Sequence, residues 1–365
     1  MLIPAYVHAL CREISLFSSS AHEKEIIHTI YFGGGTPSIL KIKYLEEILF
    51  TIRSNFYLDQ DIEISLEANP GFVDDEYARG LANLGINRLS IGMQSGDEKE
   101  LKILGRIHGL REVYNSVSAA RRAGINNINL DLIYGIPGQH QKSWQDSLSI
   151  ACDIAPEHLS LYCLTLEDNT RLKLKIDKGL YKETDPDLAA DMYEIAQEFL
   201  AGQGYKHYEI SNWAKQNNES IPSYCKHNLQ YWRNLPYIGF GAGAHGYIRN
   251  IRTVNETDPA RYIALCEKGE IDMYPKTPVT IVTQLIDQNI EIHETMMMGL
   301  RLVEEGIHSN TFYTRFGIVL EQQFATVIKE LMVKGLLEWD GPEKQILRLT
   351  RRGRILGNLV FMEFI

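Results

Sequence analysis

Polar residues follow or interrupt consecutive apolar segments of the sequence, and their types suit the binding of a small polar ligand. The first segment ends in Gly33–Pro37 (GGGTP), Glu67 lies near the end of the second, Gln94 closes the third and Asp131 lies late in the fourth. Glycines expose backbone N–H and C=O groups, although GGGTP alone is equally typical of a tight turn. A carboxylate among apolar residues needs a partner, such as an ammonium group or a ribose hydroxyl. The argument for a site rests on the joint placement of these residues.

The first two thirds of the chain alternate strand-type and helix-type segments. Six strand-type runs are visible: IIHTIYFGG, DIEISLEANP, INRLSIGMQ, NINLDLIYGIPG, EHLSLYCLTLE and YKHYEISNWA. Alternation of this kind predicts parallel strands joined by crossover helices, in a barrel or an open sheet. Ligands of such sheets bind at the carboxyl ends of the strands. The glycine turn is not a phosphate loop, because it lacks the GK[ST] sequence.

After about residue 215 the alternation ends, which predicts three units. Residues 1–215 form the barrel-like unit, and residues 216–278 form a linking segment that contains HNLQYW and GFGAGAHG. Residues 279–365 are mostly helical and include LLEWDGPEKQILRLT, which reads as strand, turn and strand. This last unit is predicted to be a winged-helix-like α+β domain. The methionines in TMMMGL are interpreted as core residues of a helix.

Composition excludes several classes of function. The 365 residues carry a net charge of −10 with no polybasic segment, which argues against a nucleic-acid-binding surface. No apolar run approaches the length of a membrane span, and the N-terminal residues do not resemble a signal peptide. The five cysteines are scattered without a CxxC pair, so disulfides are not expected and the cytoplasm is the expected compartment.

The ordered motifs resemble a known family. YFGGGTPSIL, SLEANPG, NRLSIGMQS, LGRIH and INLDLIYGIPGQ look like the radical S-adenosylmethionine enzymes of the oxygen-independent coproporphyrinogen III oxidase type. YEISNWA and HNLQYW resemble one branch of it, the heme chaperone HemW family. The resemblance extends from Tyr31 to the end of the chain. It implies a partial (β/α)6 barrel of the TIM-like radical S-adenosylmethionine type, truncated at its first strand and followed by the C-terminal domain.

The resemblance also implies a cofactor site. By matching positions, one or two S-adenosylmethionine molecules would contact Gly34, Gly35, Thr36, Glu67, Gln94, Arg106 and Asp131. A zwitterion with a diol suits this mixture of carboxylate, amide and bare backbone. Arg106, taken alone, is equally interpretable as a solvated charge or as a partner of a helix C-terminus.

Heme is the second ligand that the resemblance implies. The motif HNxxYW matches His227, Asn228, Tyr231 and Trp232, and an imidazole can bind heme iron axially. His227 is therefore the candidate iron ligand, although a histidine beside aromatic residues is more often a hydrogen-bonded loop residue. Cys225 is an alternative thiolate ligand. His245 in GFGAGAHG is a secondary candidate for cofactor binding, with packing as the other interpretation.

The sequence departs from the family at its N-terminus. Radical chemistry requires a [4Fe-4S] cluster, which the family holds with the cysteines of CxxxCxxC after a first strand of the form YxHIPFC. Here Tyr6-Val7-His8 resembles the start of that strand, and the cysteine motif is absent. Two explanations remain open: a truncated, mis-spliced or internally deleted form, or a descendant without radical chemistry. No cluster is expected on this chain.

These considerations predict a heme chaperone that binds heme and S-adenosylmethionine and passes heme to an acceptor protein. No catalytic residue is assigned. The alternatives are an oxygen-independent coproporphyrinogen III oxidase and a non-enzymatic winged-helix binding protein. Peripheral contact with a membrane stays open, as does an organelle if the natural N-terminus differs.

Overall fold

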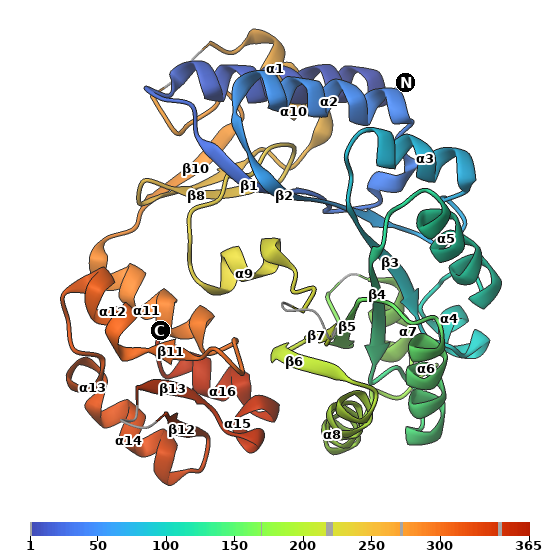
Figure 1. Cartoon of the computed structure of the whole chain (residues 1–365), viewed down its shortest axis with the longest axis vertical. Coiled ribbons are helices and arrows are strands. Elements are labelled where there is room, and N and C mark those ends of the chain that lie inside the picture. Colours follow the sequence, from blue (N-terminus) through green and yellow to red (C-terminus); the bar gives the residue numbers. More distant parts are fainter. Residues whose placement is uncertain (1, 169, 217–221, 271–272, 342–344) are drawn as a thin grey trace.

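A curled seven-stranded sheet forms the N-terminal two thirds of the protein (Figure 1). The computed structural model describes residues 2–168, 170–216, 222–270, 273–341 and 345–365. Residues 217–221 and 271–272 of the predicted linking segment and residues 342–344, where a turn was predicted, lie outside these residues. The strands are β1 (Ile26–Phe32), β2 (Tyr57–Ala68), β3 (Arg88–Gln94), β4 (Asn127–Tyr134), β5 (His158–Cys163), β6 (Tyr205–Glu209), β7 (Asn212–Lys215), β8 (His245–Ile248), β9 (Ile251–Asn255), β10 (Thr280–Leu285), β11 (Ile307–His308), β12 (Leu337–Asp340) and β13 (Ile346–Leu349).

Most of the helices cover the outer face of this sheet or belong to the C-terminal domain. They are α1 (Leu2–Ser20), α2 (Ile42–Asn55), α3 (Asp75–Asn83), α4 (Glu98–Ile103), α5 (Leu110–Arg122), α6 (Gln141–Asp153), α7 (Arg171–Asp177), α8 (Pro186–Gly202), α9 (Lys226–Trp232), α10 (Pro259–Lys268), α11 (Gln288–Gly299), α12 (Ser309–Phe316), α13 (Leu320–Gln323), α14 (Ala325–Val333), α15 (Arg351–Ile355) and α16 (Gly357–Met362), with a 3₁₀ turn, η1 (Pro37–Ile39). None of the helices in the described part of the chain combines the length and apolar composition that a membrane span needs.

The predicted half-barrel is confirmed, with a correction at its end. Strands β1 to β5 pair in chain order and are parallel. The sixth predicted run, YKHYEISNWA, is instead a hairpin in which β7 lies antiparallel to both β5 and β6. The hairpin turns at Ile210-Ser211, where the Glu209 carboxylate accepts the Ser211 N–H. The sixth run therefore contributes two strands, and the sheet has seven. A short turn is enough to join them, because they run in opposite directions.

The resemblance of Tyr6-Val7-His8 to a strand is wrong for this structure, because these residues lie in helix α1. Val7, Ile14 and Phe17 follow helical spacing and are buried in the core of the half-barrel. Helix α1 packs on α2 and α10 outside the sheet, and β1 is the edge strand. Burial of this apolar stripe stabilises the segment as a helix.

Two smaller sheets complete the fold. Strands β8, β9 and β10 form one antiparallel sheet, so the residues that follow Val279 pair back with β9. Strands β11, β13 and β12 form the other, within the C-terminal domain and its own hydrophobic core. Helix α9 lies on the inner side of the curled sheet, between the half-barrel and the C-terminal domain (Figure 1).

A buried carboxyl group joins α1 to the second sheet. Glu13 is 1% exposed. Its oxygens accept hydrogen bonds from Gly241 N (2.9 Å), Asn255 Nδ2 (2.7 Å), Tyr262 Oη (2.6 Å) and Thr277 Oγ1 (3.2 Å). Because these donors come from the segments around β8, β9, β10 and α10, one side chain holds several distant segments together.

Replacing Glu13 with alanine should lower the free energy of unfolding by about 3 kcal/mol or more, because buried donors lose their shared acceptor. Urea unfolding of the full chain measures this change. Glu46→Ala, at an exposed position of α2, is the matched control and should change the free energy by less than about 0.5 kcal/mol. Equal effects of the two substitutions would contradict the assigned role of Glu13.

Candidate functional site

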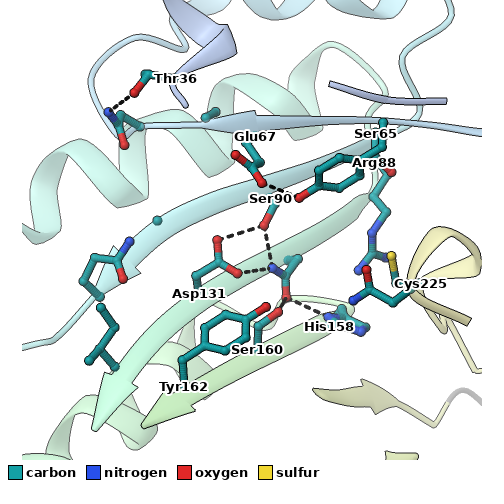
Figure 2. A pocket seen from close by; sticks show the side chains of 18 of the residues that line it. Thr36, Ser65, Glu67, Arg88, Ser90, Asp131, His158, Ser160, Tyr162 and Cys225 are labelled. Atoms are coloured by element: carbon teal, nitrogen blue, oxygen red, sulfur yellow. Dashed lines mark hydrogen bonds between the residues drawn. The ribbon is translucent and has the colours of Figure 1, made fainter. Parts of the chain in front are cut away.

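A cavity of about 400 Å³ opens on the concave face of the seven-stranded sheet. The structure brings together around it most of the predicted S-adenosylmethionine residues and one residue of HNxxYW: Gly35, Thr36, Glu67, Gln94, Arg106, Asp131 and Asn228. Figure 2 shows that Thr36, Glu67 and Asp131 come from neighbouring parts of the sheet and its loops. The remaining predicted residues do not line the cavity: Gly34, His227, Tyr231, Trp232 and His245.

The glycine turn leaves room beside the cavity. Gly34 has a positive φ of 85°, which favours glycine, and a Cβ atom at Gly34 or Gly35 would meet nothing within 4 Å. At Gly33, in contrast, a Cβ atom would lie 2.4 Å from the Tyr31 ring. Gly33 therefore makes space for an aromatic side chain, while Gly34 and Gly35 offer bare backbone to a ligand.

Tyr31 and Glu67 form a pair on the wall of the cavity. The Tyr31 hydroxyl donates to Glu67 Oε1 at 2.6 Å. Burial, followed by the charge of Glu67, raises the pKa of Tyr31 above its usual value, so the hydroxyl keeps its proton and stays a donor. One oxygen of Glu67 is thus engaged, and the carboxylate is held in place.

Gln94 reaches the cavity through an unusual backbone conformation. It has a φ of 67° at the end of β3, where the pairing with β4 is interrupted, and it is 8% exposed. A left-handed conformation of a residue other than glycine costs about 1–3 kcal/mol and is frequent at functional sites. Gly92 makes room for the Gln94 side chain, because a Cβ atom there would lie 2.6 Å from Gln94 Nε2.

Asp131 sits on a network of neutral side chains from adjacent strands (Figure 2). Its oxygens accept hydrogen bonds from Ser90 Oγ at 2.9 Å and from Asn129 Nδ2 at 2.7 Å. Asn129 Oδ1 accepts in turn from Ser160 Oγ and lies 2.7 Å from His158 Nδ1. Burial raises the pKa of Asp131 to about 6, although these hydrogen bonds act in the opposite direction.

Helix α9, which carries HNxxYW, begins at the cavity. Glu63 of β2 accepts the backbone N–H groups of Lys226 and His227, each at 3.1 Å, and Cys225 lines the cavity beside it. A carboxylate at this position compensates the positive end of the helix. The start of the motif is therefore bound to the half-barrel.

The aromatic residues at the two ends of α9 contact different parts of the protein. The His227 ring stacks on Tyr31 with centroids 4.8 Å apart, and its Nδ1 lies 2.8 Å from Thr29 Oγ1. Burial lowers the pKa of His227 to about 4, so the imidazole is neutral at pH 7. Trp232, at the other end of α9, stacks with the Arg301 guanidinium of the C-terminal domain at 4.4 Å.

The segment GFGAGAHG packs against helix α1 and does not line the cavity. Ala242 N donates to Tyr6 Oη at 2.9 Å, and a Cβ atom at Gly241 would lie 2.8 Å from the same oxygen. His245 is exposed on β8, opposite Val254 of β9. Close backbone packing explains these glycines.

The cysteines do not fit a [4Fe-4S] cluster, which needs several thiolates around one point. They lie on separate elements: Cys11 in α1, Cys152 in α6, Cys163 at the end of β5, Cys225 before α9 and Cys266 in α10. Within the described ranges no three His, Cys, Asp or Glu side chains converge as metal ligands. Burial raises the pKa of the Cys225 thiol to about 11, which disfavours the thiolate.

Several residues of the site were missed in the sequence, although strand alternation marks some of them. In INLDL, Asn129 and Asp131 alternate with leucines, and the same holds for His158 and Ser160 in HLSLY. Alternation places such residues on one face of a strand. Glu63 shows the same alternation, between Ile62 and Ile64 in DIEISLE. Tyr31 had no comparable signal, because its stacking partner His227 lies on α9, far along the chain.

Comparison with known proteins defines the class. Residues 14–151 match the profile of the Radical SAM superfamily, and residues 286–356 match the HemN C-terminal domain. The solved structure described as coproporphyrinogen III oxidase (HemN) from Escherichia coli, a radical SAM enzyme, superimposes with a TM-score of 0.82 at 21% identity. It covers 100% of this chain and 84% of that chain, and this likeness concerns the fold. The half-barrel and the C-terminal domain are thus those of a radical SAM protein of the HemN type.

Curated relatives narrow the class to one family. The heme chaperone HemW of Lactococcus lactis is 36% identical over 366 residues, which covers 100% of this chain and 90% of that protein. The heme chaperone HemW of Bacillus subtilis is 36% identical over 365 residues and 92% of its length. A mouse protein named radical S-adenosyl methionine domain-containing protein 1, mitochondrial, is 33% identical over 328 residues, 86% of this chain and 71% of its own. The chain belongs to the HemW family.

The raised pKa of Asp131 predicts a pH dependence of stability. Because the folded protein binds this proton more tightly than the unfolded chain, the contribution of Asp131 is complete below pH 4 and is lost as the pH rises through about 6. The loss should reach about 3 kcal/mol at most, since one pKa unit corresponds to about 1.4 kcal/mol. Asp131→Asn should lack this component in urea unfolding.

The difference in unfolding free energy between the wild type and Asp131→Asn reports the titration of Asp131 alone. Burial also raises the pKa of Glu13 and Glu209 to about 7, but these groups titrate in both proteins and cancel in the difference. The difference in unfolding free energy should therefore change from acidic pH to pH 6 and be constant above about pH 7. A difference that is the same at every pH would contradict the assignment.

Proposed function

We propose that this protein is a heme chaperone that binds heme and S-adenosylmethionine and delivers the heme to an acceptor protein. The observation that supports this most is the meeting of two motifs at one place. The GGGTP turn, Glu67 and Asp131 surround the cavity, and the helix of HNxxYW begins on its wall. Full-length relatives that are named heme chaperones support the same function.

S-adenosylmethionine would occupy the cavity, and its functional groups suit the lining. The bare backbone at Gly34-Gly35 would meet the amino acid part of the cofactor. Arg106 would supply a cation for its carboxylate, and the oxygens of Glu67 and Asp131 would accept hydrogen bonds from its donor groups. Ser65 Oγ, buried in the lining, has no hydrogen-bond partner among the residues that the structure describes, and a ligand would satisfy it.

Heme would be the cargo, with His227 as the axial ligand of its iron. The imidazole is neutral, as a metal ligand must be, and Nδ1 is already engaged with Thr29. Among the described residues no hydrogen bond to Nε2 is formed, so this nitrogen is available to iron. A fixed hydrogen bond on the opposite nitrogen is the usual way in which a protein orients a histidine ligand.

We propose further that this chain, as given, neither assembles a [4Fe-4S] cluster nor cleaves S-adenosylmethionine. The separate positions of its cysteines support this. Oxidative decarboxylation of coproporphyrinogen III, the alternative function, would require that chemistry. Heme binding requires only the histidine and the surface around it.

Hemin binding tests the proposed function directly. Hemin added to the full chain should give a Soret band typical of histidine ligation, and His227→Ala should abolish or shift it. Exogenous imidazole should restore the band in the variant if the site is intact. His245→Ala, at the exposed position on β8, is the control and should bind hemin like the wild type.

Two results would contradict this assignment. An unchanged spectrum of His227→Ala would show that another residue binds the iron. Loss of the band in Cys225→Ser, with the band of His227→Ala intact, would assign the iron to the thiol that the sequence offered as the alternative.

Anaerobic reconstitution with iron and sulfide tests the absence of radical chemistry. The protein should retain no stoichiometric iron–sulfur absorbance, and dithionite with S-adenosylmethionine should yield no 5′-deoxyadenosine. Hemin binding by the same sample shows that it is folded. About four irons per chain together with 5′-deoxyadenosine would contradict this proposal, and decarboxylation of coproporphyrinogen III would favour the oxidase.

A further inference from the structure

A continuous chain of hydrogen bonds joins Asp131 to the start of the heme motif. Asn129 Nδ2 donates to Asp131 Oδ1 at 2.7 Å, and Asn129 Oδ1 lies 2.7 Å from His158 Nδ1. His158 Nε2 lies 2.8 Å from Tyr208 Oη. The Tyr208 oxygen in turn accepts the backbone N–H of Cys225, the residue that precedes α9, at 3.2 Å.

The direction of every bond in this chain follows from its neighbours. Asn129 Nδ2 donates to both Asp131 and Ser90, so its Oδ1 must be the acceptor of the His158 Nδ1–H. Nε2 of His158 then carries no proton and accepts from the Tyr208 hydroxyl. His158 is 1% exposed, and its burial lowers its pKa well below 6.5, in agreement with a neutral ring.

A second connection also runs from the cavity to α9. Glu67, on the cavity wall, holds the Tyr31 hydroxyl, and the Tyr31 ring stacks on His227 with an angle of 7° between the planes. Both connections begin at a carboxylate of the cavity and end at α9. A ligand that engages Glu67 and Asp131 therefore acts on groups that position the helix.

We infer that His158 is a positioning residue that links Asp131 to the heme motif, so that S-adenosylmethionine in the cavity and heme at His227 strengthen each other's binding. This inference rests on the proposed function, because it requires both ligands to bind. It assigns a positioning task to a histidine that lies in the wall of the cavity and is 1% exposed.

The sign of the coupling follows from what each ligand needs. Heme requires an imidazole of fixed orientation, and the cavity requires Asp131 and Glu67 in fixed positions. A ligand in the cavity immobilises both carboxylates, and through Tyr208 and Tyr31 it restrains the start of α9 and the His227 ring. The second ligand then meets a site that is already ordered and loses less conformational entropy. By linkage, the effect is reciprocal.

The experiment measures the dissociation constant of hemin for the full chain with and without saturating S-adenosylmethionine. In the wild type S-adenosylmethionine should tighten hemin binding about 5–10-fold, within the usual range of coupling between sites. Tyr208→Phe keeps the ring but removes the hydroxyl between His158 and Cys225, and it should lower the ratio to about 2, because only the connection through Tyr31 remains. Tyr205→Phe is the matched control, because its buried hydroxyl donates to Pro156 O on the same sheet but outside the chain of bonds.

Two variants of His158 add a readout that general destabilisation would not give. His158→Leu should lower the coupling as Tyr208→Phe does, whereas His158→Gln, which retains a donor and an acceptor, should restore part of it. Thermal unfolding of each variant shows whether it is folded at the temperature of the titration. A ratio of one in the wild type, or wild-type ratios in Tyr208→Phe and His158→Leu, would overturn the inference.

Failure of the inference can be told apart from failure of the proposed function. If hemin and S-adenosylmethionine each bind alone but independently, the inference is wrong and the proposed function stands. If either ligand does not bind the wild type at all, both are wrong.

Discussion

The site depends on the hydrogen bonds between the Glu63 carboxylate and the first turn of α9. This helix lies on the inner side of a sheet that curls only partway round, so neighbouring strands do not enclose it. The carboxylate of Glu63 binds the N–H groups of Lys226 and His227, and without it the first turn would expose unpaired donors. The HNxxYW motif is thereby fixed to β2 at one end, while Trp232 contacts Arg301 at the other.

The inner face of the sheet also has to satisfy its own polar groups. Parallel strands covered on both faces are normally apolar, yet Ser90, Asn129, His158 and Ser160 line the concave side. They tolerate burial because each bonds to the next, and together they support Asp131. This network thus supports Asp131 from the side of the sheet.

Much of the fold and half of the site could be predicted from local patterns. Strand ends in a parallel sheet meet at one edge, which is why Gly35, Glu67, Gln94 and Asp131 were expected together. What failed depends on distant contacts. The hairpin of β6 and β7 looked like one strand because its turn at residues 210–211 is so short. Residues Tyr6 to His8 were expected to start a strand, but they lie in a helix whose residue Val7 packs into the core.

The residues that connect the two motifs could not be found in this way. Tyr208 meets His158 and Cys225 across 50 and 17 residues, and His227 meets Tyr31 from the opposite end of the half-barrel. No periodicity in the sequence indicates such contacts, because they form only when α9 packs against the sheet. They also do not involve Cys11, Cys152, Cys163 or Cys266. The cavity and the start of α9 are therefore positioned by contacts that are independent of these four cysteines, so the proposed binding of heme and S-adenosylmethionine does not require them.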